Sequence, residues 1–394
     1  MVPEGWKRAS GEDIAEKITK GQSPKWQGFD YQDHGTLFVT SENVREGYLD
    51  ISKPKYLPIA FNKKLKGSQL RKGDLLINIV GASIGRSCMF DLDVEHANIN
   101  QAVCLFRTNP QVRSEYIIQY LQLPTTIDKL LGTQTESARP NLSLGDMRDF
   151  LFLVPPLSEQ KKIAKILSTW DQTITATEHL LENSQQRKKA LMQQLLTGKK
   201  RLPGFEGEWE NSTLTQHCSV VTGNKDLQNK VEDGEYPFFV RSSNIERIDS
   251  YSFDGEAILI PGDGRVGEIF HYINGRFGFH QRVYKLSDFK GALGLFIYYY
   301  LKRFFKAEVI KNSVKATVDS LRMPVFTGMR IKLPSLEEQQ LIIDVLSCSD
   351  KEIQAISRRL NLLRQEKKAL MQQLLTGKQR VKGDAVSSTE EAVC

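Results

Sequence analysis

One stretch of the sequence has the residue types and the spacing of a nucleotide-binding loop. Gly262–Gly267 reads GDGRVG and follows an apolar run, as in the GxGxxG pattern whose glycines let a backbone approach a pyrophosphate. The residues that follow, EIFHYINGRFGF, are typical of strand and turn, whereas a dinucleotide site needs a helix N-terminus there. A β-turn therefore explains these glycines better than a nucleotide site does.

Other patterns that carry chemistry are absent from the sequence. There is no GxxxxGK phosphate loop, no HExxH, no GxSxG and no DPPY- or NPPY-type motif of an amino-methyltransferase. The six histidines and five cysteines are scattered without metal-ligand or CxxC spacing, which argues against a zinc site and a disulfide framework. We therefore predict a binding protein that is not an enzyme and has no metal site.

The composition sets broad limits on the protein. A chain of 394 residues, 40% hydrophobic and 26% charged, is long enough for two or three globular domains. A net charge of +7 over this length is only weak support for nucleic-acid binding. No apolar run approaches the roughly 20 residues of a membrane helix, and the start MVPEGWKRAS lacks the apolar core of a signal peptide. The expected location is the cytoplasm.

The sequence is duplicated. KKALMQQLLTGK occurs as Lys188–Lys199 and again as Lys367–Lys378, and at this offset Pro155–Lys199 matches Pro334–Lys378 without a gap, with 24 identities in 45 positions. Fainter matches precede these segments: LFVTSENV resembles FFVRSSNI, GDLLINIVGASIG resembles GEAILIPGDGRVG, and NQAV resembles HQRV. One constant and one variable part in each copy suggest a constant partner and two different targets.

Each constant part predicts one long helix. Ser158–Thr197 and Leu336–Thr376 contain neither proline nor glycine, and Gly198 and Gly377 follow at the position of a C-terminal cap. A heptad seam of mainly apolar residues predicts a coiled coil, about 40 residues make a rod of roughly 60 Å, and the duplication favours two antiparallel rods. The alternative is that each helix packs only on its own domain. The seam residues are Ile163, Leu167, Trp170, Ile174, Thr177, Leu181, Ser184, Lys188, Leu191 and Leu195, then Ile342, Leu346, Ser349, Ile353, Ile356, Leu360, Leu363, Lys367, Leu370 and Leu374.

Apolar residues also lie beside the seam near the end of each helix, which widens the apolar stripe beyond what one partner helix covers. A second protein could dock there, and it would dock twice because the two copies are identical. The alternative is that these residues cover the adjacent domain, and the pattern does not decide between the two. The candidate partner-binding residues are Leu191, Met192, Leu195, Leu196, Leu370, Met371, Leu374 and Leu375.

The variable parts predict a mixed α/β fold. Short apolar runs with turn signals indicate strands at GTLFVT, GDLLINIV, SCMFDL and AVCLFR in the first copy, and at YPFFV, EAILI, EIFHYI and RVYKL in the second. A helix follows near Ser114–Leu123 in the first copy and near Leu293–Lys306 in the second. The fold class is therefore α/β, with a tandem duplication of two mixed α/β domains and two long antiparallel coiled-coil helices.

At this point the residues are similar to a known family. LVPPLSEQKKIAKIL and KLPSLEEQQLIIDVL open the long helices, KKALMQQLLTGK closes both, and the chain resembles over its whole length the specificity subunit of type I restriction-modification systems. The resemblance implies target-recognition domains at 1–154 and 201–333, spacer helices at 155–200 and 334–380, and a disordered tail at 381–394. It also implies that each domain reads one half of a split, asymmetric DNA target, and that the helices set the gap between the halves.

The resemblance further implies partners and cofactors that this chain does not carry itself. Two methyltransferase (modification) subunits would dock on the helices, bind S-adenosylmethionine and methylate adenines. Restriction subunits that use ATP and Mg could join the complex to cleave unmodified DNA. The chain itself would bind double-stranded DNA and perform no chemistry.

Polar and basic residues at predicted turns are the candidate DNA contacts, although ordinary surface solvation is the alternative for each one. The first domain also has a dense basic run, KPKYLPIAFNKKLK, that could contact phosphates. The candidates are Asn43, Arg45, Lys63, Lys64, Arg86, Asn98, Asn100, Gln101 and Arg139 in the first domain, and Arg241, Asn244, Arg247, Arg265, Arg276, His280, Gln281 and Arg282 in the second.

Three other functions remain open at this stage. The chain could be a coiled-coil scaffold or adaptor without DNA affinity, which would show no salt-dependent binding to duplex DNA. It could be the DNA-recognition subunit of a related methylation system that is not type I. A nucleotide-using enzyme built on Gly262–Gly267 would bind a cofactor through its second half.

Overall fold

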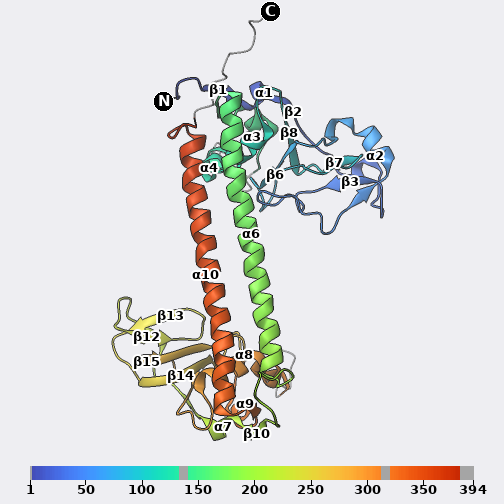
Figure 1. Ribbon diagram of the computed structural model, residues 1–394. Helices are drawn as coiled ribbons and strands as arrows, with labels where there is room; N and C mark the ends of the chain where they lie inside the picture. The colour runs from blue at the N-terminus through green and yellow to red at the C-terminus, as the bar shows by residue number, and fades with distance from the viewer. Residues whose placement is uncertain (1, 133–140, 312–319, 382–394) are drawn as a thin grey trace, which may run out of the picture. The chain divides into compact units, whose positions relative to one another are not determined.

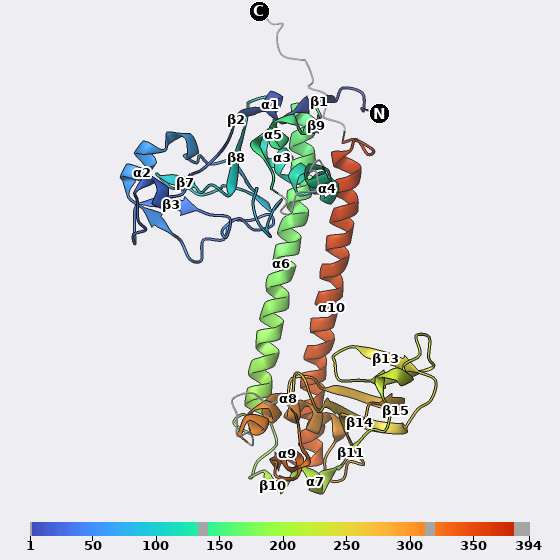
Figure 2. The same ribbon diagram turned by 180° about the vertical axis from the view of Figure 1, so that it is seen from behind.

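The computed structural model describes residues 2–132, 141–311 and 320–381 of the chain. It divides into two compact units. Unit 1 comprises Met1–Thr177 with Arg359–Cys394, and unit 2 comprises Glu178–Arg358. Each unit therefore contains one globular domain together with part of each long helix. Figures 1 and 2 show the two units and the helices that they share.

Unit 1 is a mixed α/β domain with two larger sheets and one two-stranded sheet. Its strands are β1 (Lys7–Ser10), β2 (Ala15–Lys20), β3 (Thr36–Val39), β4 (Tyr56–Leu57), β5 (Leu75–Asn78), β6 (Ser87–Met89), β7 (Ala97–Ile99), β8 (Val103–Thr108) and β9 (Leu151–Val154). One antiparallel sheet has the order β2-β8-β5-β6, and the other has the order β4-β3-β7, in which β3 and β7 are parallel. β1 pairs with β9, so the start of the domain is fixed to the strand that leads into the first long helix.

The helices of unit 1 are short apart from the two long ones. They are α1 (Gly11–Ile14), α2 (Ile59–Lys64), α3 (Ser114–Leu121), α4 (Pro124–Gly132) and α5 (Leu144–Asp149), with 3₁₀ turns at Lys25–Gln27 and Lys66–Ser68. The strand runs LLIN of β5 and VCLFR of β8 are buried along their length, as expected for central strands covered on both faces. The main core of the unit gathers residues from both of these strands, from α3 and from both long helices.

Unit 2 repeats this plan with longer strands. Its strands are β10 (Glu210–Thr213), β11 (Ser219–Thr222), β12 (Tyr236–Phe239), β13 (Ile245–Ile248), β14 (Phe253–Pro261), β15 (His271–Phe279), β16 (Val283–Ser287) and β17 (Arg330–Leu333). Its helices are α7 (Leu214–His217), α8 (Gly294–Lys311) and α9 (Met323–Thr327), with a 3₁₀ turn at Leu227–Asn229. The main sheet has the order β11-β16-β14-β15-β12-β13, and β10 pairs with β17 as β1 pairs with β9. The mixed α/β fold predicted for both copies is confirmed.

The two long helices are α6 (Leu157–Leu195) and α10 (Leu336–Leu375). They end where the sequence predicts, because Gly198 and Gly377 adopt the left-handed conformation, with φ of +69° and +71°. In each unit the two helices pack side by side and run antiparallel (Figures 1 and 2). None of the predicted seam residues is fully exposed, so the coiled-coil seam is confirmed.

The duplication explains the contacts that hold each unit together. In unit 1 Lys367 of α10 pairs with Asp171 of α6, and in unit 2 Lys188 of α6 pairs with Asp350 of α10. Each lysine at a seam position therefore has an aspartate of the other helix as its ion-pair partner, so neither lysine is left as an unpaired charge between the helices. No helix among the described residues is long and apolar enough to cross a membrane.

Candidate functional site

An open cleft of about 550 Å³ lies at the loops that follow β3 and β5 in unit 1. Two loops that are some 40 residues apart in sequence form its walls, and the sheets set their separation. Four basic and two acidic residues line it, which gives a positive balance. The lining residues are Ser41, Glu42, Asn43, Arg45, Asp50, Ser52, Lys53, Lys55, Ser83 and Arg86.

Two asparagines fix the loops around this cleft. Asn78 is buried at the end of β5, and its Nδ2 donates to the carbonyl oxygen of Ser41 at 2.9 Å and to Oγ of Ser83 at 3.0 Å. Asn43 accepts from the backbone N–H of Thr40 at 2.8 Å. The bonds of Asn78 join the two loops, and the bond of Asn43 closes a turn within the first loop, so both loops are held in place around the cleft.

The charges of this cleft are only partly paired. Arg45 contacts Asp50 at 3.2 Å and Lys55 contacts Glu42 at 2.9 Å, so both acids have a basic neighbour. Hydrogen bonds from Ser52 lower the pKa of Asp50, which keeps it ionised at neutral pH. The exposed side chain of Arg86 has no ion pair among the described residues and is available to an anionic ligand. Such a cleft suits a polyanion.

A second open cleft, of about 450 Å³, lies at the loops that follow β12 and β14 in unit 2. Its lining residues are Leu227, Val240, Arg241, Ser242, Glu246, Asp263, Gly264 and His280. Burial, followed by the neighbouring Arg241, lowers the pKa of His280, so its ring is neutral at pH 7. The glycine-rich stretch Gly262–Gly267 forms part of this wall as a loop between two strands, which confirms that it is a turn.

The two clefts occupy equivalent places in the duplicated fold. The backbone N–H of Asn100 donates to the carbonyl of Val39 in unit 1, and that of His280 donates to the carbonyl of Phe239 in unit 2. Val80 forms an isolated antiparallel bridge with Asn141, and Asp263 forms the same kind of bridge with Ser320. The equivalent pairs are Val39 and Phe239, Ser41 and Arg241, Val80 and Asp263, and Ala102 and Arg282. The structure therefore shifts two of the sequence matches by one residue. These are the match of LFVTSENV with FFVRSSNI and the match of GDLLINIVGASIG with GEAILIPGDGRVG. The match of NQAV with HQRV stands.

The structure brings some of the predicted DNA contacts together. Asn43, Arg45 and Arg86 line the cleft of unit 1, and Arg241 and His280 line the cleft of unit 2. Arginine 282 joins the second group through an ion pair with Asp263. Sequence reasoning missed Asp263 and Asp50 because it looked only for donors and basic groups near turns.

Other residues predicted to contact DNA make hydrogen bonds within the fold. Asn98 is fully buried and bonds Asn62, Ser68 and the carbonyl of Leu65, so DNA cannot reach it, which corrects that assignment. Arg247 donates to two backbone carbonyls at 2.8 and 2.9 Å and fixes the start of β12. The side chain of Asn100 caps its own turn by accepting from the N–H of Ala102.

The remaining candidates lie outside the two clefts. Most are exposed, and several already hold an ion pair or a hydrogen bond, as Arg265 does with Glu268 at 2.9 Å and Arg276 with Asp254 at 2.9 Å. Arg139 lies outside the described residues. The others are Lys63, Lys64, Gln101, Asn244 and Gln281, which stay predictions as surface contacts.

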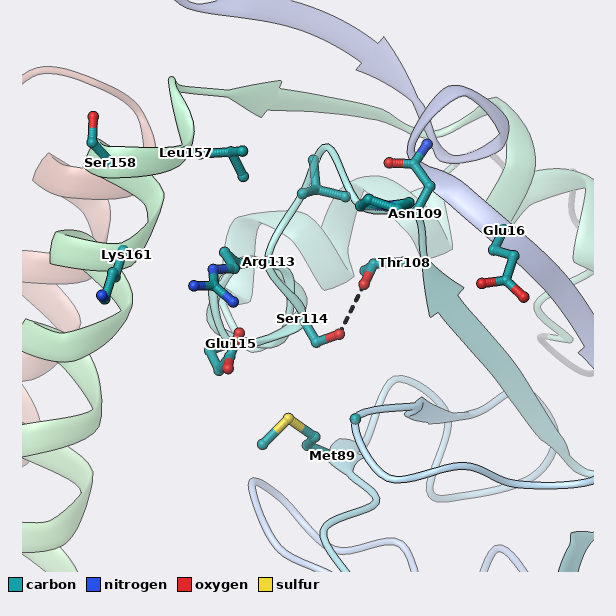
Figure 3. A pocket seen from close by; sticks show the side chains of 13 residues that line it. Glu16, Met89, Thr108, Asn109, Arg113, Ser114, Glu115, Leu157, Ser158 and Lys161 are labelled. Carbon is teal, nitrogen blue, oxygen red and sulfur yellow. Dashed lines mark hydrogen bonds between the residues drawn. The ribbon is translucent and has the colours of Figure 1, made fainter. Parts of the chain in front are cut away.

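A third cleft in unit 1 lies between the domain and the first turn of α6 (Figure 3). Arg113 and Lys161 supply positive charge, but Glu16 and Glu115 line the same space, so the cleft has no net preference for an anion. The Oγ1 of Thr108 and Oγ of Ser114 bond each other at 2.8 Å. The exposed side chain of Leu157 forms one border of this cleft.

The apolar residues predicted to bind a partner pack inside the chain. Leu374, Leu375 and Met371 are buried in the core of unit 1, and Leu195 and Leu196 are buried in that of unit 2. Leu191 and Met192 pack against the core of unit 2, and Leu370 packs against that of unit 1. These side chains cover the adjacent domains, the alternative left open by the sequence. This corrects the expectation that they form a free docking surface.

Comparison with known proteins decides the family. The family model described as "Type I restriction modification DNA specificity domain" matches residues 3–184 and 206–365, once in each copy. The chain belongs to this family. The MjaVIII specificity subunit of a type I restriction enzyme from Methanocaldococcus jannaschii is 24% identical over 97% of this chain and 94% of that protein. The EcoDI specificity subunit from Escherichia coli is 29% identical over 43% of this chain and 37% of that protein.

Solved structures of the type I specificity family have the same fold. The S subunit of a type I restriction-modification system from M. genitalium superposes with a TM-score of 0.64, at 14% identity, over 95% of this chain and 96% of that chain. At this identity the likeness concerns the fold alone. The duplicated α/β architecture with two long helices predicted from the sequence is thus that of type I specificity subunits.

Proposed function

We propose that this specificity-family chain is the DNA-recognition subunit of a type I restriction-modification complex, in which each globular domain reads one half of a bipartite, asymmetric target. The observation that carries the proposal is the pair of equivalent clefts, which share a backbone framework but present different side chains. A duplicated fold that read the same sequence twice would keep the same side chains. Different side chains at equivalent positions suit two different half-sites.

In this proposal the chain binds the DNA target and positions its partner subunits on it, and the partner subunits catalyse the reactions. Two modification subunits bind S-adenosylmethionine and methylate adenine bases that are flipped out of the duplex. Restriction subunits, which use ATP and Mg, join the same complex to cleave unmodified DNA. Because the complex acts on chromosomal DNA, it works in the cytoplasm. The helices α6 and α10 set the gap between the two half-sites.

We infer the docking surface from identities between the copies that packing inside the chain does not explain. At most exposed middle positions of the helices the copies differ, as Thr175 does from Gln354 and Glu182 from Asn361, although the exposed Ala176 and Ala355 are identical. Near the C-terminal ends of the helices, four exposed residues of each copy are identical and have the i, i+3, i+4, i+7 spacing of one helix face, while the exposed Arg187 and Glu366 beside them differ. We name these the repeat face: Gln186, Lys189, Ala190 and Gln193, with Gln365, Lys368, Ala369 and Gln372.

Each unit carries one complete copy of this surface. Unit 1 contains Gln365–Gln372 of α10, whereas unit 2 contains Gln186–Gln193 of α6. Two identical surfaces fit two identical partners. A surface of glutamines and lysines around small alanines is polar enough to stay in water when the partner is absent.

Introducing glutamate at Ala190 and Ala369 together should abolish binding of the modification subunits. Both alanines are exposed, and glutamate is also a good helix former, so the helices should keep their stability while the face gains bulk and negative charge. Native mass spectrometry of the reconstituted complex should show two partners on the wild-type chain, one on Ala190→Glu alone and none on the double variant.

The matched control is Thr175→Glu with Gln354→Glu, at exposed positions of the same helices where the copies differ. This control should bind both partners. Two partners on the Ala190→Glu, Ala369→Glu double variant would show that the repeat face is not the docking surface.

The proposed function is tested by selection of DNA from a random pool. The chain in complex with its adenine-methyltransferase partners should enrich duplexes with two short, dissimilar motifs at a fixed spacing. The free energy of binding should also weaken as salt rises, because phosphate contacts release counterions. A complex that forms but enriches no motif and shows no salt-dependent DNA binding would instead identify a scaffold protein.

A further inference from the structure

Three loops of unit 2 meet at the carboxylate of Asp263. Its Oδ2 lies 3.4 Å from Nη1 of Arg241 and 3.4 Å from Nη1 of Arg282. Arg241 follows β12, Asp263 follows β14 and Arg282 precedes β16, so the tertiary fold rather than local sequence assembles the group. We call these three residues the arginine–aspartate triad.

The two arginines keep most of their hydrogen-bonding capacity. Their side chains are 48% and 63% exposed, and among the described residues Asp263 is the side-chain partner of both. Each guanidinium has five N–H donors, and 3.4 Å is long compared with the roughly 2.7–2.9 Å of a tight charge-assisted hydrogen bond. The carboxylate therefore orients the two groups without occupying them.

One carboxylate oxygen of Asp263 has no hydrogen-bond partner in the part of the chain that the structure describes. Its side chain is only 17% exposed, and its Oδ1 is buried without a hydrogen-bond partner in the structure. An unsatisfied buried carboxylate oxygen costs free energy, and folded proteins retain few such groups without a use for them. The backbone just before Asp263 is anchored, since Gly262 accepts from the N–H of Leu321 at 2.6 Å. A fixed acceptor can therefore hold both arginines.

The fold does not require the triad. The equivalent positions in unit 1 are Ser41, Val80 and Ala102, none of which is charged. There the two loops are joined by Asn78, whose equivalent in unit 2 is Pro261. One copy of the duplicated fold thus joins its loops with a neutral amide, and the other places two exposed guanidinium groups at the same site.

We propose that the arginine–aspartate triad reads a guanine in the half-site recognised by unit 2, with Asp263 as the positioning residue for Arg241 and Arg282. The inference rests on the proposed function and specifies the base that this cleft recognises. An arginine held in plane can donate two parallel hydrogen bonds to O6 and N7 of guanine in the major groove, the commonest base-specific contact that proteins make. Unit 1, with uncharged residues at these positions, reads its half-site differently.

The test exchanges each arginine for lysine in the full chain bound to its modification subunits. Lysine keeps the positive charge, so binding to phosphates survives, but it cannot form the planar pair of bonds to guanine. Arg241→Lys or Arg282→Lys should reduce the preference for guanine at one position of one half-site roughly 10- to 100-fold. Affinity for non-target DNA and the preference at the other half-site should not change.

Asp263→Asn tests the positioning role separately. It should relax the preference at the same guanine while the melting temperature of the complex and its non-target affinity stay near wild type, a result that a purely structural role would not give. The control is Arg303→Lys, an exposed arginine on α8 of the same unit and outside the triad's cleft, which should leave base preference unchanged.

Three outcomes would overturn the triad assignment while leaving the proposed function in place. The wild-type complex could select a bipartite target with no guanine in either half. The lysine variants could keep full base preference. Asp263→Asn could relax a cytosine or adenine position instead, which would make the aspartate itself a reader of an exocyclic amino group. If the wild-type complex selects no motif at all, the proposed function fails first.

Discussion

Replacing Arg380 by alanine should loosen unit 1 at the junction of its first strand with the start of α6. Nε and Nη2 of Arg380 each donate to the carboxylate of Glu159 at 2.9 Å, and Glu159 is 4% exposed. Removing Arg380 leaves the buried Glu159 carboxylate with the hydrogen bonds of Trp6 and Val381 but without a compensating charge, which is more costly than removing both charges. Amide hydrogen exchange in β1 and β9 should become faster by roughly tenfold or more.

The duplication supplies a matched control for the Arg380 experiment. Arg201 makes the equivalent paired contact with Glu338 in unit 2, at 2.7 Å from both of its nitrogens. Arg201→Ala should therefore accelerate exchange in β10 and β17 and leave β1 and β9 protected. Adding Glu159→Gln to Arg380→Ala should restore part of the lost protection, because no buried charge then remains unpaired. Unchanged exchange in β1 and β9 of Arg380→Ala would contradict the account.

The same pair makes unit 1 sensitive to acid. Burial alone raises the pKa of Glu159, but hydrogen bonds from Arg380 and Trp6 outweigh it and hold the pKa below its usual value. A carboxylate whose pKa is depressed in the folded state stabilises the fold above its unfolded pKa of about 4.3, and this contribution is lost as the pH falls through the folded value. The difference in free energy of unfolding between wild type and Arg380→Ala should therefore shrink below about pH 4.

Lengthening both long helices by seven residues should lengthen the gap in the DNA target and leave both half-sites unchanged. A heptad inserted after Thr177 in α6 and another after Arg358 in α10 keeps the seam in register. Seven helical residues add about 10 Å, which corresponds to roughly three base pairs of B-DNA. The methylated motif of a strain that carries this variant should therefore show a gap about three base pairs longer.

The control places the heptad in one helix only. The pairs Lys367 with Asp171 and Lys188 with Asp350 then cannot both form, so this variant should lose helix pairing and stable assembly. If the double insertion yields an active complex with the original gap, the helices do not set the spacing of the target.

The sequence predicts the large architecture well because its signals are local and repeated. Prolines before each long helix, Gly198 and Gly377 after it, and the heptad pattern between them specify two rods, which the structure confirms within two residues at each end. Two lysines, Lys188 and Lys367, stand at seam positions. They are tolerated because Asp171 and Asp350 lie across the helix pair, and that pairing depends on antiparallel packing.

The candidate site was less accessible to sequence reasoning because distant segments build it. Asn98 looked like a turn residue available to DNA, but its partners Asn62 and Ser68 lie about 30 residues away and bury it. An apolar stripe such as Leu195 and Leu196 does not reveal whether a domain or another protein covers it. Asp263 carried no signal of its own, since its role depends on loops that only the folded sheet brings together.

In the function that we propose, this chain directs a DNA adenine methyltransferase to a bipartite target. Single-molecule sequencing of methylated bases in the host, with and without this gene, tests it most directly. One motif, with two dissimilar halves separated by a fixed gap and adenine methylation in each half, should disappear when the gene is deleted and return when it is restored. A methylome that the deletion leaves unchanged, or the loss of an undivided motif instead, would contradict it.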